Sequence, residues 1–432
     1  MSRQTSFSLS PQIIFLLTFA GVILLGWGLL SLPVMHSAQA SGATWLDHLF
    51  TATSGVSTTG LCTLSFAEDY SRWGQFVVLI LFQLGGLGYV AFAGAAGLSG
   101  GQIDGSLKKA VTAGSYLPEN LELRFFLRIT LAFTFVVEAL GSIVLSTAFM
   151  QQGMHWQEAL WQGVYHSISA FCTAGFGLHP DSLQAYGDAP EILVPVILLM
   201  LTGSLGFMVV AALYEWLTGR ARRFDHMTKA VCTLFAILFI ATAVLAYSTS
   251  STIGGTAYPV IHAVFLSATS LTGAGFASVN TGALSLGVLC AIMLPMCAGG
   301  APSGTSGGIK LSNLAVNFAA LWAQVRDLKE PHIDGVTLPG SQQRQAASVV
   351  FLFALLLLLG LVWMLFLESG NLPFQAIAFE AVSAFGTVGL SRGITGELLD
   401  STKGLMIALM FVGRVGVLTL ILGLLRTGAD VK

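Results

Sequence analysis

Long apolar stretches follow one another along the chain, separated by shorter polar or glycine-rich segments. They cover residues 11–35, 74–99, 125–150, 189–217, 227–248, 284–298, 346–367 and 403–425. A helix needs about 20 residues to cross a bilayer, and every stretch except 284–298 reaches that length. Because backbone polar groups find no water in hydrocarbon, these stretches are predicted to be membrane helices. The strand-length alternation of a membrane barrel does not occur in the sequence.

A twelve-residue pattern returns four times between these stretches. The copies are FTATSGVSTTGL (50–61), YHSISAFCTAGF (165–176), FLSATSLTGAGF (265–276) and FEAVSAFGTVGL (379–390). Each opens with an aromatic residue, has Ser or Thr four residues later, and has Gly at its eleventh position. Glycine recurs 24 to 28 residues further on, in GGLG (85–88), GSLG (203–206), GRVG (413–416) and at Gly299 in the third copy. Such small residues let helices approach closely.

The repeats predict an all-α membrane protein of four tandem units, each a membrane helix, a short pore half-helix and a second membrane helix. The units are residues 1–105, 106–222, 223–330 and 331–432. Together they give eight transmembrane helices and four half-helices around one pseudo-fourfold pore. Duplication without function is the alternative, although it leaves the repeated glycines unexplained.

The end of each pattern is suited to a dehydrated cation. Rings of backbone carbonyls can replace the hydration shell of an ion, and Gly permits the positive φ that turns a carbonyl inward. The C-terminal end of a half-helix adds partial negative charge. The predicted selectivity filter lies at 57–61, 172–176, 272–276 and 386–390. The predicted filter residues are Thr58, Thr59, Gly60, Thr173, Ala174, Gly175, Gly273, Ala274, Gly275, Thr387, Val388 and Gly389.

Composition and charge agree with a membrane transporter. Of the 432 residues 54% are hydrophobic and 9% are charged, against about 25% charged in a soluble domain. With both termini inside, 14 of the 19 basic residues fall on the cytoplasmic side, and the outer loops carry Asp and Glu that would concentrate cations. We therefore expect a multi-pass protein of the cell (inner) membrane that contacts lipid and binds no nucleic acid.

The stretch GGAPSGTSGG (299–308) interrupts the second membrane helix of the third unit, because its composition cannot continue a helix at low cost. Below a ring of filters, this loop would plug the pore; a kink without function is the alternative. The predicted gate comprises Gly299, Gly300, Ser303, Gly304, Thr305, Ser306, Gly307, Gly308, Lys310 and Arg414. An Arg within the membrane normally faces a polar interior, so Arg414 provides a fixed charge below the filter or pairs with Glu138 or a carbonyl.

Two other classes of function can be compared with this one. The sequence Gly304-Thr-Ser306-Gly-Gly308 matches GxSxG, as in a serine protease, but His166 and His262 are expected at the outer ends of their helices. An alternating-access carrier would show inverted repeats, whereas these four copies share one orientation. No enzyme activity is predicted, and no cofactor is expected on this chain.

Over essentially its whole length the chain resembles the Trk/Ktr/HKT superfamily of potassium transporters, and the Ktr-type membrane subunit most. The resemblance rests on the four repeats, the segments STTGL, CTAGF, TGAGF and GTVGL, the interrupted helix and Arg414. It implies K⁺ uptake, with K⁺ at the filter residues, a gating loop, a homodimer and a cytoplasmic ring of nucleotide-binding regulatory subunits. Gly273 departs from the pattern where the other copies have Thr, which leaves Na⁺ or mixed cation transport as the alternative.

Overall fold

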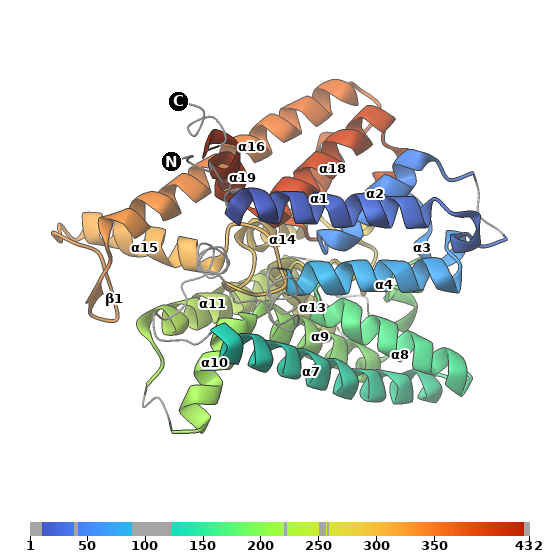
Figure 1. Cartoon of the computed structure of the whole chain (residues 1–432), viewed down its shortest axis with the longest axis horizontal. Helices are drawn as coiled ribbons and strands as arrows, with labels where there is room; N and C mark the ends of the chain where they lie inside the picture. Colours follow the sequence, from blue (N-terminus) through green and yellow to red (C-terminus); the bar gives the residue numbers. More distant parts are fainter. Residues whose placement is uncertain are drawn as a thin grey trace, which may run out of the picture.

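The computed structural model describes residues 11–38, 42–88, 123–219, 223–249, 256 and 259–426. This part of the protein is built almost entirely from helices (Figure 1). The boundary between the first two predicted units, the segment 99–122 and both chain ends fall outside the described residues.

The helices come in a repeating order of long, short and intermediate length. The long helices are α1 (Pro11–Leu30), α7 (Leu123–Gln151), α11 (His226–Thr249) and α16 (Gly340–Leu367). The short helices that follow them are α2 (Trp45–Val56), α8 (Trp156–Phe171), α13 (Pro259–Thr272) and α17 (Phe374–Gly386). The third position holds α4 (Arg72–Leu87), α9 (Pro190–Ser204) with α10 (Gly206–Leu217), α14 (Leu286–Ala298) with α15 (Leu311–Val325), and α18 (Asp400–Val415) with α19 (Val417–Arg426).

Within the described residues, the connections contain only short elements. These are η1 (Pro33–Met35), α3 (Phe66–Asp69), η2 (Gln184–Tyr186), η3 (Thr281–Ala283), η4 (Thr395–Glu397) and an antiparallel hairpin of β1 (His332–Ile333) and β2 (Val336–Thr337). The hairpin and the end of α15 extend from one side of the helical body (Figure 1).

The long helices present apolar side chains to their surroundings as well as to the core. Phe351 and Phe366 on α16 are 67% and 77% exposed, and Ile143 on α7 is 62% exposed. By length and composition, four helices can cross a membrane: residues 13–30, 126–151, 226–249 and 340–367. The bent pair α9 and α10 gives a fifth. Apolar helices with apolar outer faces identify a multi-pass membrane protein.

The helices pack in a circular order. Each short helix contacts the long helix before it and the helix after it. The helix after it also contacts the short helix of the next unit, in the pairs α4 with α8, α9 with α13, α14 with α17, and α18 with α2. Because the last pair returns to the start of the chain, the four short helices surround a common centre.

The stretch 189–217, which the sequence presents as one apolar helix, is two helices that meet at 88°. The break falls at Gly206, whose φ is +81°, and α10 leaves the bundle steeply in Figure 1. The loop after α14 bonds to the carbonyls that the break frees, since Ala301 N donates to Ser204 O at 3.0 Å and Thr305 N donates to Gly203 O at 3.3 Å. The hydrophobic pattern could not reveal the break, because both halves are apolar.

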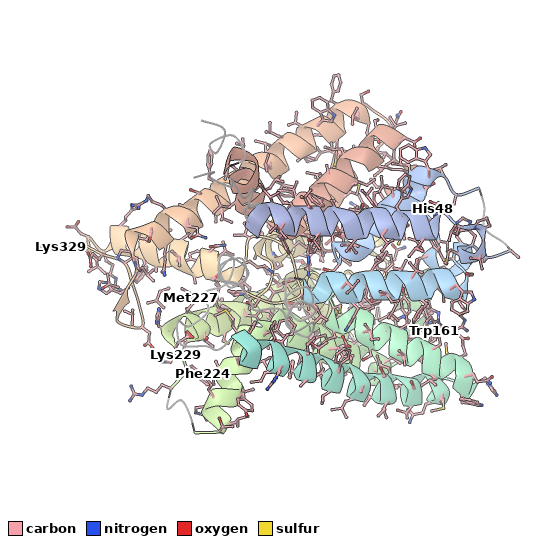
Figure 2. All side chains as sticks on the ribbon, in the orientation of Figure 1. His48, Trp161, Phe224, Met227, Lys229 and Lys329 are labelled. Carbon is pink, nitrogen blue, oxygen red and sulfur yellow. The ribbon has the colours of Figure 1, made fainter. Side chains whose placement is uncertain are left out.

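The two ends of the helical body differ in their side chains. Figure 2 places His48 and Trp161, near the starts of two short helices, at one end, and Phe224, Lys229 and Lys329 at the other. At the second end Lys229 forms a hydrogen-bonded ion pair with Asp334 of the hairpin, and this bond holds the pKa of the Asp334 carboxyl below its ordinary value of 3.8.

Candidate ion filter

The four repeated segments share one backbone conformation. The residue two positions before the glycine at the eleventh position, here called the ring glycine, is left-handed in every copy. The φ values are 52° at Thr58, 51° at Thr173, 68° at Gly273 and 50° at Thr387. The ring glycines also have positive φ: 90° at Gly60, 71° at Gly175, 76° at Gly275 and 93° at Gly389.

A backbone hydrogen bond fixes each turn. The residue before each ring glycine donates its N–H to the carbonyl of the Ser or Thr five residues earlier. The pairs are Thr59–Ser54, Ala174–Ser169 and Val388–Ser383 at 2.8 Å and Ala274–Thr269 at 3.0 Å. The Ser or Thr shared by the four sequence patterns therefore provides the carbonyl that accepts the hydrogen bond of each turn.

The segments meet in a closed ring. A Cβ atom added to Gly60 would lie 2.5 Å from the carbonyl oxygen of Ala174 in the next copy. The other ring glycines have the same relation to the copy that follows: Gly175 to the carbonyl of Ala274, Gly275 to that of Val388, and Gly389 to that of Thr59. Because backbone lies on both sides of each contact, no side chain fits at a ring glycine.

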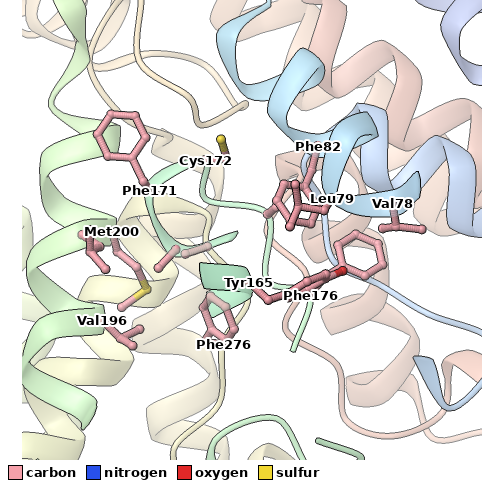
Figure 3. Packing of buried hydrophobic residues seen from close by; sticks show 14 of the residues in the cluster. Val78, Leu79, Phe82, Tyr165, Phe171, Cys172, Phe176, Val196, Met200 and Phe276 are labelled. Carbon is pink, nitrogen blue, oxygen red and sulfur yellow. The ribbon is translucent and has the colours of Figure 1, made fainter. Parts of the chain in front are cut away.

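Buried aromatic side chains support the ring from behind. Phe176, directly after Gly175, packs against Phe82 of α4 with the ring centroids 6.1 Å apart. Phe82 in turn meets Tyr165 of α8 edge to face at 5.5 Å. Figure 3 shows this group beside Leu79 and Val78. The second segment therefore rests on a close-packed wall made by two units.

A second set of glycines brings the later helices against the ends of the short helices. Cβ atoms on Gly85, Gly203 and Gly413 would overlap the carbonyls of Val56, Phe171 and Phe385 respectively. Each of these carbonyls belongs to the residue four positions before a ring glycine. This contact explains why glycine recurs at a nearly fixed distance after three of the four patterns.

The loop between α14 and α15 lies against the ring on one side. Thr305 is fully buried, and its carbonyl oxygen accepts a hydrogen bond from Thr58 Oγ1 at 3.3 Å. Its hydroxyl accepts one from Thr173 Oγ1 at 3.1 Å and donates to the carbonyl of Phe171 at 3.2 Å. The loop is thus attached to the first two segments through Thr58 and Thr173, each of which lies two residues before its ring glycine.

Gly273 is the residue that departs from the repeated pattern, because the other three segments have threonine at this position. A Cβ atom there would lie 3.3 Å from the carbonyl of Thr387 and 3.7 Å from Cβ of Ser306 in the loop. The space left by the missing threonine side chain therefore borders the loop as well as the neighbouring segment. The φ of +68° at Gly273 also suits glycine better than threonine.

The loop also bonds within itself. Gly300 N donates to Ser306 Oγ at 2.8 Å, Leu311 N donates to Gly300 O at 3.0 Å, and Lys310 Nζ donates to the carbonyl of Ser306. The remaining predicted gate residues of the loop are Gly299, Ser303, Gly304, Gly307 and Gly308, and Gly308 packs against Gly299. A Cβ atom on Gly307 would overlap Thr387 Oγ1, so the loop also approaches the fourth segment.

Arg414 joins the loop to the first unit. Its Nη1 donates to the carbonyl of Thr305, and its Nη2 donates to the carbonyls of Gly85 and, at 3.3 Å, Gly86. Of the two pairings considered from the sequence, these contacts match the pairing with carbonyls. Glu138 accepts a hydrogen bond from Gln83 Nε2 at 3.0 Å.

Polar contacts also link neighbouring units on the other side of the ring. Arg72 pairs with Glu158, and Lys403 Nζ lies 3.5 Å from Asp47 Oδ1 in a buried pair between the last and first units. Arg392 Nη2 donates to the carbonyl of Gly282 at 2.7 Å.

Sequence reasoning missed the buried carboxylate of Glu380, which contacts the segment after the fourth ring glycine. A charged residue inside an apolar half-helix is a signal that could have revealed it. The serine-protease alternative gains nothing from the geometry, because His166 and His262 bond to Gln162 and Ser278 while Ser306 Oγ accepts from Gly300.

Comparison with known proteins gives consistent matches over nearly the whole chain. The family profile described as "TrkH: Cation transport protein" matches residues 23–426. The chain is 31% identical to the Ktr system potassium uptake protein B of Bacillus subtilis over 427 residues, which cover 97% of this chain and 94% of that protein.

Two further sequence relatives and one solved structure agree. The chain is 32% identical to the Ktr system potassium uptake protein B of Vibrio alginolyticus, over 95% of this chain and 90% of that protein. It is 30% identical to the potassium/sodium uptake protein NtpJ of Enterococcus hirae, over 98% and 95%. The crystal structure of the potassium transporter TrkH from Vibrio parahaemolyticus superimposes with a TM-score of 0.75 at 18% identity, covering 98% of this chain and 86% of that one.

Proposed function

This chain belongs to the TrkH family of cation transport proteins, and from that premise we propose that it takes up potassium ions across the cell membrane. The resemblance to the Trk/Ktr/HKT superfamily is confirmed, and its relatives are named as transporters rather than enzymes. K⁺ is the cargo, and the chain itself holds no cofactor in this proposal.

The observation that carries the proposal is the closed ring of glycine-to-carbonyl contacts. Four segments with the same positive-φ turns converge there, each from the C-terminal end of a short helix. Carbonyl oxygens of residues 58–60, 173–175, 273–275 and 387–389 would replace the water around K⁺, and the helix ends would add partial negative charge. We propose that each unit is a membrane helix, a pore half-helix and a second membrane helix.

The loop 299–308 and Arg414 form the gate in this mechanism. Thr305 touches the first two segments, and Arg414 donates to the same Thr305 carbonyl that accepts from Thr58. A cation leaving the ring would meet this loop and the charge of Arg414. Transport therefore requires the loop to move, which breaks the bonds to Thr305.

A second candidate is Na⁺ or mixed cation transport by the same ring. It is favoured by the relative of Enterococcus hirae that is named for potassium and sodium uptake, and by the absence of a threonine side chain at Gly273. Four ring glycines in one conformation favour potassium, because each carbonyl ring then has equivalent members.

The proposed topology places both termini and the basic end of the helical body in the cytoplasm. Lys229 and Lys329 lie at that end in Figure 2, and basic residues are retained inside during insertion. The acidic side chains of Asp47 and Glu158 lie near the starts of short helices, which would face the outside.

We also propose that the chain works as a homodimer with a cytoplasmic ring of nucleotide-binding regulatory subunits. Two relatives carry names that place them within a Ktr system, and loop movement needs an energy source that distinguishes the open from the closed state. Co-expression with a soluble nucleotide-binding protein, followed by size-exclusion chromatography, should give a complex whose flux responds to ATP or ADP. Full nucleotide-regulated transport by the chain alone would contradict this part.

The uptake function can be tested in cells. A bacterial strain without potassium uptake systems should grow on micromolar-range K⁺ when it produces this chain, with its regulatory subunit if one is required. Growth should be lost with Gly60→Asp, which puts a charged side chain into the ring. Equal growth with the variant and the unchanged protein would argue against conduction through the ring.

A further inference from the structure

The fourth copy of the pattern contains a carboxylate where the others have none. Nine residues before the ring glycine, the four copies have Thr51, His166, Leu266 and Glu380. Glu380 is fully buried in α17. Thr51 and His166 instead bond to carbonyls of their own helices, those of Asp47 and Gln162, each at 2.9 Å.

Glu380 reaches the chain that follows the fourth ring glycine. Its Oε1 accepts from Ser391 Oγ at 2.6 Å and from the backbone N–H of Arg392 at 3.0 Å. Its Oε2 accepts from Thr395 Oγ1 at 3.1 Å. One side chain of the short helix α17 therefore accepts hydrogen bonds from three donors in residues 391–395.

The same segment is fastened to the third unit on its other side. Thr281 Oγ1 donates to the carbonyl of Ser391, and Arg392 Nη2 donates to the carbonyl of Gly282 at 2.7 Å. Glu380 and these two bonds thus hold the same stretch of chain, residues 391–395, from the short helix and from the third unit. This stretch begins two residues after Gly389, the ring glycine that closes the ring against Thr59 of the first copy.

We propose that Glu380 is a specificity-determining positioning residue, which holds the fourth segment so that its carbonyls keep the spacing that favours K⁺ over Na⁺. This inference rests on the proposed function. Ring carbonyls repel one another, so the ring keeps its radius only if each segment is anchored from behind. Glu380 acts through its accepted hydrogen bonds, and it does not touch the ion.

The test uses the full chain in liposomes and measures Rb⁺ uptake against increasing Na⁺. Glu380→Leu, which introduces the residue found at position 266, should lower the preference for Rb⁺ over Na⁺ by at least about tenfold, because three buried donors lose their acceptor. Glu380→Gln keeps one acceptor oxygen and can donate to Thr395, so its preference should stay within about threefold of the unchanged protein.

Glu368→Gln is the matched control, since Glu368 is also buried in the fourth unit and accepts from Leu399 N at 2.9 Å, outside the segment 387–395. It should keep the original preference. If Glu380→Leu does not fold, Ser391→Ala removes one donor and should still lower the preference several-fold.

An unchanged preference in folded Glu380→Leu, or in Ser391→Ala where the Leu variant fails, would overturn the inference. A loss in Glu380→Gln as large as in the Leu variant would also overturn it, because charge rather than anchoring would then be responsible. No preference for Rb⁺ in the unchanged protein would instead refute the proposed function.

Discussion

Replacement of Gly389 by Ser is expected to reduce the preference for K⁺ over Na⁺. Gly389 has φ +93°, and an added Cβ would overlap the carbonyl oxygen of Thr59 across the seam between the last and first copies. The left-handed backbone costs a side chain about 1–2 kcal/mol. Overlap in a close-packed region costs about 1–3 kcal/mol more, because backbone on both sides cannot rotate away.

Gly153 provides a matched control for the backbone strain. Its φ is +89°, and a Cβ there would meet nothing within 4 Å. Gly153→Ser therefore carries the same cost of conformation without the overlap. The difference between the two variants isolates the ring contact and corresponds to about 1–3 kcal/mol, or about fivefold to a hundredfold or more in preference.

The assay is competition of Na⁺ with Rb⁺ uptake in liposomes that contain equal amounts of correctly folded variant. Gly389→Ser should need at least about fivefold less Na⁺ for half-inhibition, whereas Gly153→Ser should follow the unchanged protein. Identical competition curves for all three proteins would refute the reasoning, since the carbonyl at position 59 would then play no part in selection.

Three further outcomes are expected. Arg414→Ala should raise Rb⁺ leak several-fold without a stimulus, because it removes one of the donors to the Thr305 carbonyl and leaves Thr58 Oγ1. Arg326 is an exposed cation over Trp322, and Arg326→Ala should leave the leak unchanged; equal leak from the two variants would argue against a gate. Thr305→Val, measured in the same liposomes, should raise the leak less than Arg414→Ala, since it removes only the hydroxyl bonds to Thr173 and Phe171. A lower flux in Thr305→Val than in the unchanged protein would contradict this prediction. Burial lowers the pKa of His179 below its ordinary 6.5 despite the opposing charges of Asp181 and Glu158. The contribution of neutral His179 to stability is therefore present above about pH 6.5 and is lost as the pH falls further. The melting temperature should drop less between about pH 7 and pH 5 in His179→Gln than in the unchanged protein, and matching pH profiles of the two would count against this prediction.

Much of the architecture follows from the sequence because the repeats are visible in it. The aromatic opening, the Ser or Thr and the ring glycine define four equivalent short helices and turns, and the helices lie at those positions. The interruption after Ala298 can be read from five glycines and one proline in ten residues. Local composition is sufficient where a backbone must leave the helical region.

The rest depends on contacts between units that no local pattern encodes. Gly60 and Ala174 are far apart in the chain, and only the assembled ring shows that one packs on the carbonyl of the other. The 88° break before Gly206 lies in an apolar stretch whose hydrophobicity is the same on both sides. The meaning of Gly273 changes in the same way, because the neighbours of the missing side chain include a loop residue 33 positions later, Ser306.

The most direct measurement is Rb⁺ uptake by liposomes that contain the purified chain, with K⁺, Na⁺ and choline as competitors. If the glycine ring selects potassium, K⁺ should compete with Rb⁺ at equal concentration, Na⁺ only at a large excess, and choline not at all. A potassium-selective ring would be contradicted if Na⁺ competed as well as K⁺. It would also be contradicted if Rb⁺ uptake were no greater than in empty liposomes when any required regulatory subunit and nucleotide are present.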